Sequence, residues 1–188
     1  MSCQKEISSD IPGQTTPNNL LGTWKFINSH VTTNSNVEIT DVSSDVKTIT
    51  LSDYVTSNNQ GILQFNDSLM ITTGVSYDVS ATAQSYTYDN GNLDDSTDFP
   101  FSFSLPASSS SSAYKRIGTD SIYAPGGTLT QVAGATGMLS ASGGYKYKLT
   151  GDTLLLTMMV NQSLVDTSFG FPITSTDKAT VITTLSKQ

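Results

Sequence analysis

The stretch that decides the fold class of this chain is YKYKLTGDTLLLTMMV, residues 145–160. Its first arm places Tyr145, Tyr147 and Leu149 between polar residues, and its second arm returns with apolar side chains at 154, 156, 158 and 160. Alternation with a period of two residues is typical of a strand with one buried face. Because Thr150-Gly151-Asp152 between the arms is a turn sequence, the stretch predicts an antiparallel hairpin.

The same alternation recurs outward from this hairpin in both directions. Regular strands are predicted over 75–88, 99–105 and 179–185, and less regular ones near 24–33, 46–55, 61–66, 68–73, 113–123 and 128–133. Asn90-Gly91 between two of these strands suits a tight hairpin turn, since both residue types tolerate a positive φ.

Strands joined by short turns, without helical crossovers, predict an all-β fold with little helix. We expect an antiparallel meander barrel of about 8–10 strands, because closing such a sheet removes its exposed edges. The length of 188 residues fits one domain over 19–188, preceded by a tether over 1–18. Charged residues make up only 13% of the chain, and Ser, Thr, Asn and Gly fill the polar positions, as in strands and turns.

The charge balance argues against nucleic acid as a partner. Nine basic residues stand against 16 acidic ones, the net charge is −7, and Arg116 is the only arginine. Nucleic-acid binding needs clustered Lys and Arg to neutralise phosphates, and an anionic membrane surface makes the same demand. We therefore expect neither as a binding partner.

The only cysteine, Cys3, excludes an intrachain disulfide. Ser2-Cys3 resembles the lipidation point of a mature bacterial lipoprotein, and residues 4–19 hold Pro12, Gly13 and Pro17 among polar side chains, as a tether would. The expectation is a domain that is lipid-anchored at Cys3 to the outer membrane of the cell envelope, periplasmic or exposed at the surface. The alternative is an ordinary exposed thiol.

Gly22-Thr23-Trp24, directly after the tether, resembles the Gly-x-Trp opening of lipocalins. The 145–157 hairpin with a closing strand at 178–187 looks like the lipocalin-like lipoproteins of Bacteroidetes, which have a calycin-type β-barrel. The resemblance implies structural roles for Gly22 and for Trp24, which would plug one barrel end. In lipocalins an Arg of the last strand packs across this Trp, and here Lys187 is the nearest candidate.

The residues of a catalytic or metal site are largely missing. His30 is the only histidine and has no acidic neighbour in sequence, so neither a nucleophilic triad nor a zinc site is expected. We predict no enzyme activity, no cofactor and no metal. Two alternatives stay open: the acidic stretch 89–98 as a Ca²⁺ site rather than a solvated hairpin loop, and the low-complexity loop 107–112 as a lid rather than a plain connection.

The resulting hypothesis is a monomeric binding protein that holds a small apolar or amphipathic ligand inside the barrel. Aromatic and aliphatic walls with a few hydroxyls are typical of such pockets. The predicted ligand-binding residues are Tyr77, Val79, Phe101, Phe103, Tyr145, Tyr147, Leu156 and Met158. The alternative is a structural or accessory lipoprotein whose barrel is filled by its own side chains and which acts through protein–protein contacts.

Overall fold

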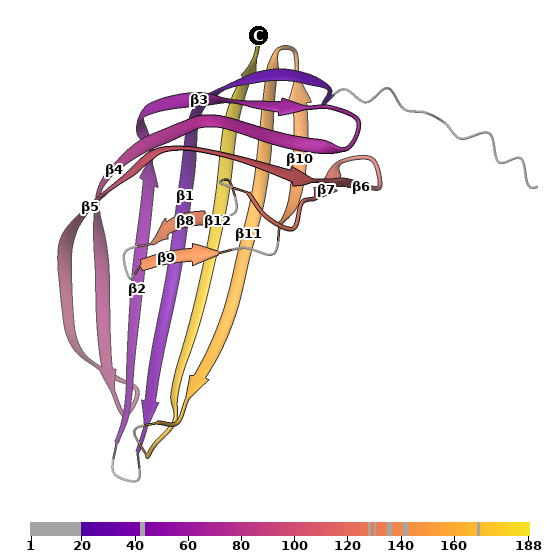
Figure 1. Cartoon of the computed structure of the whole chain (residues 1–188). Coiled ribbons are helices and arrows are strands. Elements are labelled where there is room, and N and C mark those ends of the chain that lie inside the picture. Colours follow the sequence, from indigo (N-terminus) through magenta and orange to yellow (C-terminus); the bar gives the residue numbers. More distant parts are fainter. Residues whose placement is uncertain are drawn as a thin grey trace, which may run out of the picture.

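A computed structural model describes residues 20–41, 44–127, 129, 131–134, 137–140, 143–168 and 170–188 of the chain. Strands make up 82% of these residues, and the sheet is antiparallel throughout (Figure 1). None of the described residues belongs to a helix that could cross a membrane. The predicted all-β, barrel-like meander is confirmed.

Twelve strands follow one another in the described part of the chain. They are β1 (Gly22–Thr40), β2 (Asp45–Val55), β3 (Ser57–Phe65), β4 (Leu69–Asp89), β5 (Asn92–Ala113), β6 (Lys115–Ile117), β7 (Ser121–Tyr123), β8 (Gln131–Gly134), β9 (Gly137–Ser140), β10 (Gly144–Thr150), β11 (Thr153–Asp166) and β12 (Ile173–Lys187).

The large sheet curls round at the end that carries the C-terminus, called here the closed end, at the top of Figure 1. Its ring of hydrogen bonds runs through β1, β2, β4 and β3, since β2 pairs with β1 and β4, and β3 pairs with β4 and β1. At the closed end the hydrogen-bonded order is β4-β3-β1-β12-β11-β10-β7-β6, and β5 pairs with β4. A single residue, Tyr114, separates β5 from β6, so one continuous stretch of chain borders both ends of this order. Below the closed end, the long strands β1, β2, β4, β5, β11 and β12 continue as a curved, open sheet (Figure 1).

A sharp bend in the pairing of β3 with β4 allows these strands to wrap over the closed end. The register shifts between Gln60 and Ile62, next to Gly61, which has φ of 105°. A Cβ on Gly61 would lie 2.6 Å from the Cα of Val75 on β4. Glycine is required here, because any side chain would keep the two backbones apart.

The core lies inside the closed end. Strands of opposite sides contribute large side chains that are almost without exposed surface. They are Leu20, Trp24, Leu63, Phe65, Met70, Val75, Val79, Ile122, Leu154, Leu156, Met158 and Leu185. The small sheet β8–β9 also contributes, since Leu139 of β9 belongs to this core and is 8% exposed.

Both predicted hairpins are present. Strands β10 and β11 pair from Tyr145↔Met158 to Thr150↔Thr153. Strands β4 and β5 turn at Asn90-Gly91, where φ is positive at both residues, 48° and 79°. Strand β1 is longer than predicted and extends to Thr40.

Two predicted loops and one predicted strand are wrong. Residues 107–112 and 92–98 both lie within β5, paired with β4. Ser110 of β5 and Thr72 of β4 bond to one another across the strands there, at 2.8 Å between hydroxyls. The single strand predicted over 113–123 is instead the β6–β7 hairpin, which turns at 118–120. The tether and Cys3 lie outside the described residues.

Candidate binding site

The inner face of the sheet carries a continuous row of side chains from β7 to β2. The pairing registers place Ile122, Tyr145, Met158, Val181, Val31 and Tyr54 opposite one another in this order. All six are buried. Directly opposed residues of an antiparallel pair share a face, so this row crosses the interior as one apolar band.

The eight predicted ligand-binding residues all belong to the core or pack against it, but their exposure divides them into two groups. Val79, Tyr145, Leu156 and Met158 are between 1% and 3% exposed. A side chain that lined an empty cavity of ligand size would show surface to that cavity, so these four are closed in by protein. The other four, Tyr77, Phe101, Phe103 and Tyr147, are only partly buried.

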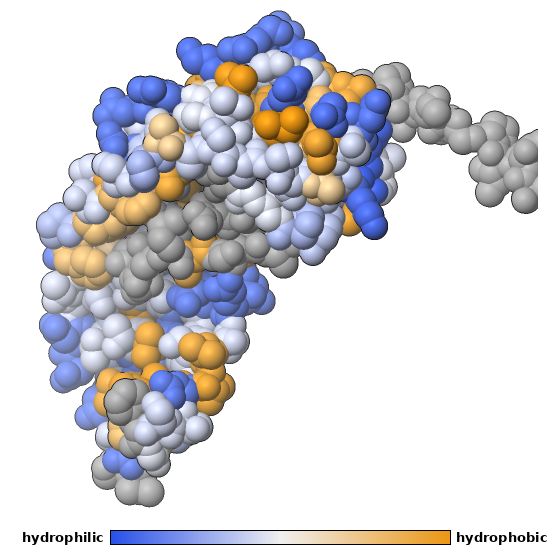
Figure 2. All heavy atoms as spheres, in the orientation of Figure 1, coloured by the Kyte–Doolittle hydropathy of each residue, from blue (hydrophilic) through white to orange (hydrophobic). Residues whose placement is uncertain are grey.

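Three of the partly buried side chains form an aromatic wall on β4 and β5, defined here as Tyr77, Phe101 and Phe103. Tyr77 contacts Phe103, with 6.4 Å between ring centroids, and meets Phe26 of β1 edge-on at 6.2 Å. Phe101 meets Tyr54 of β2 edge-on at 5.9 Å. The edge-on contacts hold Tyr77 and Phe101 in place, and the contact with Phe103 is tilted. In Figure 2, which has the orientation of Figure 1, apolar surface lies in the region of β4 and β5.

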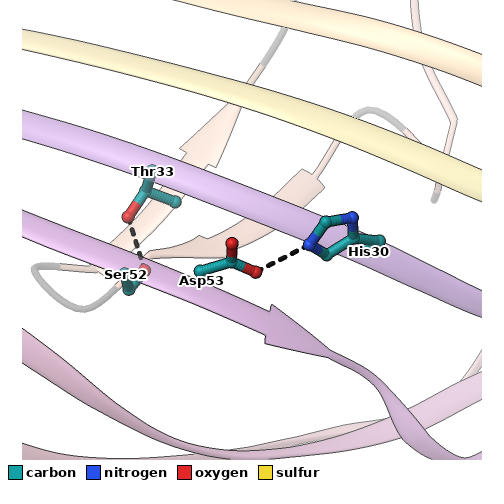
Figure 3. Close-up of polar contacts among 4 residues, drawn as sticks. All are labelled: His30, Thr33, Ser52 and Asp53. Carbon is teal, nitrogen blue, oxygen red and sulfur yellow. Dashed lines mark hydrogen bonds and ion pairs between the residues drawn. The ribbon is translucent and has the colours of Figure 1, made fainter.

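Toward the open end, the inner face becomes polar. Thr33 and Ser52 bond to one another at 2.6 Å between hydroxyls (Figure 3). One pair further along, the hydroxyl of Ser35 donates to the carboxylate of Asp177 on β12. Apolar side chains at the closed end and small polar ones toward the open end make this interior amphipathic along the strands.

Three tyrosine hydroxyls on the inner face lie in an apolar setting. Burial raises the pKa of Tyr145 and of Tyr77, and burial together with the nearby Tyr77 raises the pKa of Tyr54. The hydroxyl of Tyr145 is buried without a hydrogen-bond partner among the described residues. Two residues along the same strand, the hydroxyl of Tyr147 donates to the carbonyl of Thr119 at 2.8 Å and accepts from Arg116 at 3.1 Å.

Trp24 closes the end of the interior that faces the C-terminus. It is 1% exposed, and its indole N–H donates to the carbonyl of Leu20 at 2.9 Å. The register places it opposite Lys187 of β12, in the region where the sequence predicts its partner. Its burial leaves no indole surface for a ligand, which agrees with a structural role. Gly22 lies at the start of β1 with φ of 122°, and a Cβ there would lie 2.8 Å from the Lys187 amine.

Sequence reasoning missed a polar pair on the outer face. His30 Nε2 lies 2.6 Å from a carboxylate oxygen of Asp53, and both side chains are well exposed (Figure 3). The two residues are 23 positions apart and meet only because β1 and β2 pair. Asp53 also borders an outer hollow of about 620 Å³ that Thr32, Leu51 and Gln84 help to line.

This pair lacks the third group that nucleophilic catalysis needs. A triad requires a hydroxyl or thiol donating to the histidine, and among the described residues Asp53 is the only side-chain partner of His30. The described residues also contain no group of three or more His, Cys, Asp or Glu side chains placed to hold a metal. The acidic residues of 92–98 are spread along the exposed strand β5.

Comparison with protein families, with curated proteins and with solved structures gives no match for this chain. The resemblance to lipocalins therefore rests on Gly22-Thr23-Trp24 and on the hairpin of β10 and β11 alone, and membership of that group stays a prediction.

Proposed function

We propose that this domain is a binding module, without catalysis, for a small amphipathic ligand whose apolar part contacts the aromatic wall. The observation that carries the proposal is the partial exposure of Tyr77, Phe101 and Phe103, which lie together beside fully buried core residues such as Val79. Partly exposed rings held by contacts with other aromatic side chains are a suitable surface for an apolar group.

The polar residues beyond the wall support an amphipathic rather than a purely apolar ligand. Thr33, Ser35 and Ser52 point to the same face, and each already bonds to a neighbouring side chain. These side chains keep 6–8% of their surface exposed, and a hydroxyl can accept one further bond while donating another, so a head group that contacts this surface need not displace their partners. The ligand would lie along the strands, with its head group toward the open end.

The test uses 11-(dansylamino)undecanoic acid, a fluorescent amphiphile, and the full chain. We expect saturable binding with a blue-shifted emission, and displacement of the probe by oleic acid. Phe101→Asn should weaken binding about tenfold, which corresponds to about 1.4 kcal/mol. Ser102→Asn is the matched control, because Ser102 is exposed on the opposite face of the same strand and should leave the affinity unchanged.

Thermal unfolding of both variants separates loss of the ligand surface from loss of the fold. The proposal fails if the probe does not bind saturably to the folded chain, or if Phe101→Asn and Ser102→Asn bind it equally well.

A second candidate function is a filled barrel that acts through protein–protein contacts. The close burial of Val79, Tyr145, Leu156 and Met158 favours it, since small barrels are often filled by their own side chains. Native mass spectrometry of the protein from its host separates the two: a co-purifying small molecule supports the binding module, and an unliganded chain supports the filled barrel. Lipid anchoring at Cys3 in the cell envelope stays a prediction beside either function.

A further inference from the structure

A row of polar side chains crosses the inner face of the sheet on the side of Thr33 that lies toward the open end. The six residues of this row come from β11, β12, β1, β2, β4 and β5, and the pairing registers place each directly opposite the next. They are Gln162, Asp177, Ser35, Thr50, Ser85 and Thr97. Directly opposed residues share a face, so these side chains form one band, called here the polar row. Asp177 is its only charged member.

The polar row is sheltered at its centre and exposed at its ends. Ser35 and Thr50 are 8% and 7% exposed, and Asp177 beside them is partly buried. Gln162 and Thr97, at the two ends, are exposed. A charge that is partly removed from water is screened less by solvent and salt than a charge at the surface. The carboxylate of Asp177 therefore acts more strongly on a bound group than an exposed carboxylate would.

Hydrogen bonds within the row leave acceptor capacity on Asp177. Ser35 donates to Oδ1 of this carboxylate, and Gln162 is its other neighbour in the row. An ionised carboxylate offers about four acceptor sites, which is more than two neighbours fill with one bond each. A ligand group that donates hydrogen bonds can therefore bind to Asp177, whereas a ligand carboxylate at the same place is repelled.

The charges around Asp177 act in the same direction. Among the described residues, the charged side chains that share the inner face with Asp177 toward the open end are all carboxylates, namely Asp89, Asp95 and Asp166. Lys178 occupies the next position along β12 and points to the outer face. Arg116 lies in the row of Ile122, nearer the closed end, and donates to Tyr147. The inner face thus favours a positive charge at the polar row.

The distance from the aromatic wall to the polar row fits a ligand with a long alkyl chain. Phe101 of the wall and Thr97 of the row lie on the same face of β5, because an even number of residues separates them. At about 3.4 Å per residue they are about 14 Å apart along the strand. An extended dodecyl chain has a similar length, so its apolar end can contact the wall while its head group lies at the polar row.

We infer that Asp177 determines the head-group specificity of this domain, and that the head group it selects is a protonated amine. The inference rests on the proposed function, because it identifies the polar end of the ligand whose apolar part contacts the aromatic wall. A protonated amine carries three donors and no acceptor, so it can bond to Asp177 and to hydroxyls of the row together. Hydrogen bonds between ionised groups are also roughly twice as strong as neutral ones.

Competition between two amphiphiles of equal chain length tests the head group. Dodecylamine and dodecanoic acid are each titrated against the full chain loaded with 11-(dansylamino)undecanoic acid, at neutral pH, physiological salt and concentrations below those at which either aggregates. We expect the amine to displace the probe at about tenfold lower concentration than the acid.

Substitutions at Asp177 separate a local effect from the attraction of any cation to a chain of net charge −7. Asp177→Asn keeps an oxygen that accepts from Ser35 but removes the charge, and should reduce the difference between the competitors to about twofold or less. Asp98→Asn is the matched control, because Asp98 is exposed on the outer face of β5 next to Thr97 and its substitution changes the net charge equally. This control should keep the preference for the amine, as should Asp177→Glu, which retains the charge.

The outcomes distinguish this inference from the proposed function. Equal displacement by the amine and the acid from the wild-type chain overturns the inference and leaves the binding module standing, and this comparison needs no variant to fold. A preference that Asp177→Asn and Asp98→Asn lose equally, or that both keep, overturns it as well. If the probe does not bind saturably, the proposed function fails and the inference fails with it. Thermal unfolding of each variant shows whether a lost preference reflects a lost fold.

Discussion

The amine of Lys187 lies 4.4 Å from the centroid of the Trp24 ring and donates to the backbone carbonyl of Leu21 at 2.7 Å. The side chain of Lys187 on the last strand thus holds Trp24 of the first strand in place at the end of the interior. A cation over an aromatic face is favourable, and the bond to Leu21 sets the position of the amine.

Trp24→Ala should therefore lower the free energy of unfolding by about 3–5 kcal/mol, as for other large buried aromatic side chains. Lys187→Met should cost about 1 kcal/mol, because it removes the cation over the ring and the bond to Leu21. Denaturant unfolding measures both. Lys148→Met, at an exposed position of β10, is the control and should change stability by less than about 0.5 kcal/mol. A loss below about 1 kcal/mol in Trp24→Ala would contradict the role assigned to the indole.

The unpaired hydroxyl of Tyr145 leads to the second prediction. An unsatisfied buried polar group costs about 1–3 kcal/mol, so Tyr145→Phe should leave stability unchanged or raise it by about 1 kcal/mol. Tyr147→Phe is the matched variant on the same strand. It should destabilise by about 1 kcal/mol, because it breaks bonds to Thr119 and Arg116. The same loss in both variants would show that the Tyr145 hydroxyl has a partner.

The third prediction concerns the bend between β3 and β4. Gly61→Ala should cost more than about 3 kcal/mol, because the new Cβ would lie 2.6 Å from backbone of β4. Gly74, on the opposite strand, has φ of 61°, and a Cβ added there would have no neighbour within 4 Å, so Gly74→Ala should cost only about 1–2 kcal/mol of backbone strain. Thermal unfolding of the two variants compares them. Equal losses would mean that conformation alone, and not the close approach of the strands, requires glycine at Gly61.

The buried tyrosines predict how stability responds to alkaline pH. Burial raises the pKa of Tyr54, Tyr77 and Tyr145 in the folded chain above the ordinary value of 10.0. The folded state then holds these protons more tightly than the unfolded chain. Their contribution to stability is fully present below a pH of about 10 and is lost as the pH rises above it.

Phenolate absorbance during an alkaline titration measures this effect. Some of the eight tyrosines should ionise only when the fold opens, as followed by circular dichroism. In denaturant all of them should titrate near a pH of about 10. If every tyrosine ionised in one step while the circular dichroism stayed native, burial would not raise the pKa of Tyr54, Tyr77 and Tyr145.

Local sequence determined most of the strands and which side chains of each strand share a face, but not which face points inward. Alternating residues of a strand point to opposite faces, so the pattern of Tyr145, Tyr147 and Leu149 against Leu154, Leu156 and Met158 predicted both arms of the hairpin and their common face. The turn at Asn90-Gly91 followed from the same kind of information, since positive φ depends on residue type. These features depend on residues that are close together in the chain.

Only the tertiary structure decided which distant residues meet. The serine-rich segment 107–112 carries no apolar pattern, yet it is a strand, because β4 offers it a paired edge and Thr72 bonds to Ser110. Asp53 lies beside His30 because β1 pairs with β2, and this pairing cannot be predicted from either segment alone. The burial of Val79 and Leu156 and the partial exposure of the aromatic wall likewise depend on where each strand ends beside its neighbours. Burial and pairing are properties of the assembled sheet, and no single segment of the chain contains them.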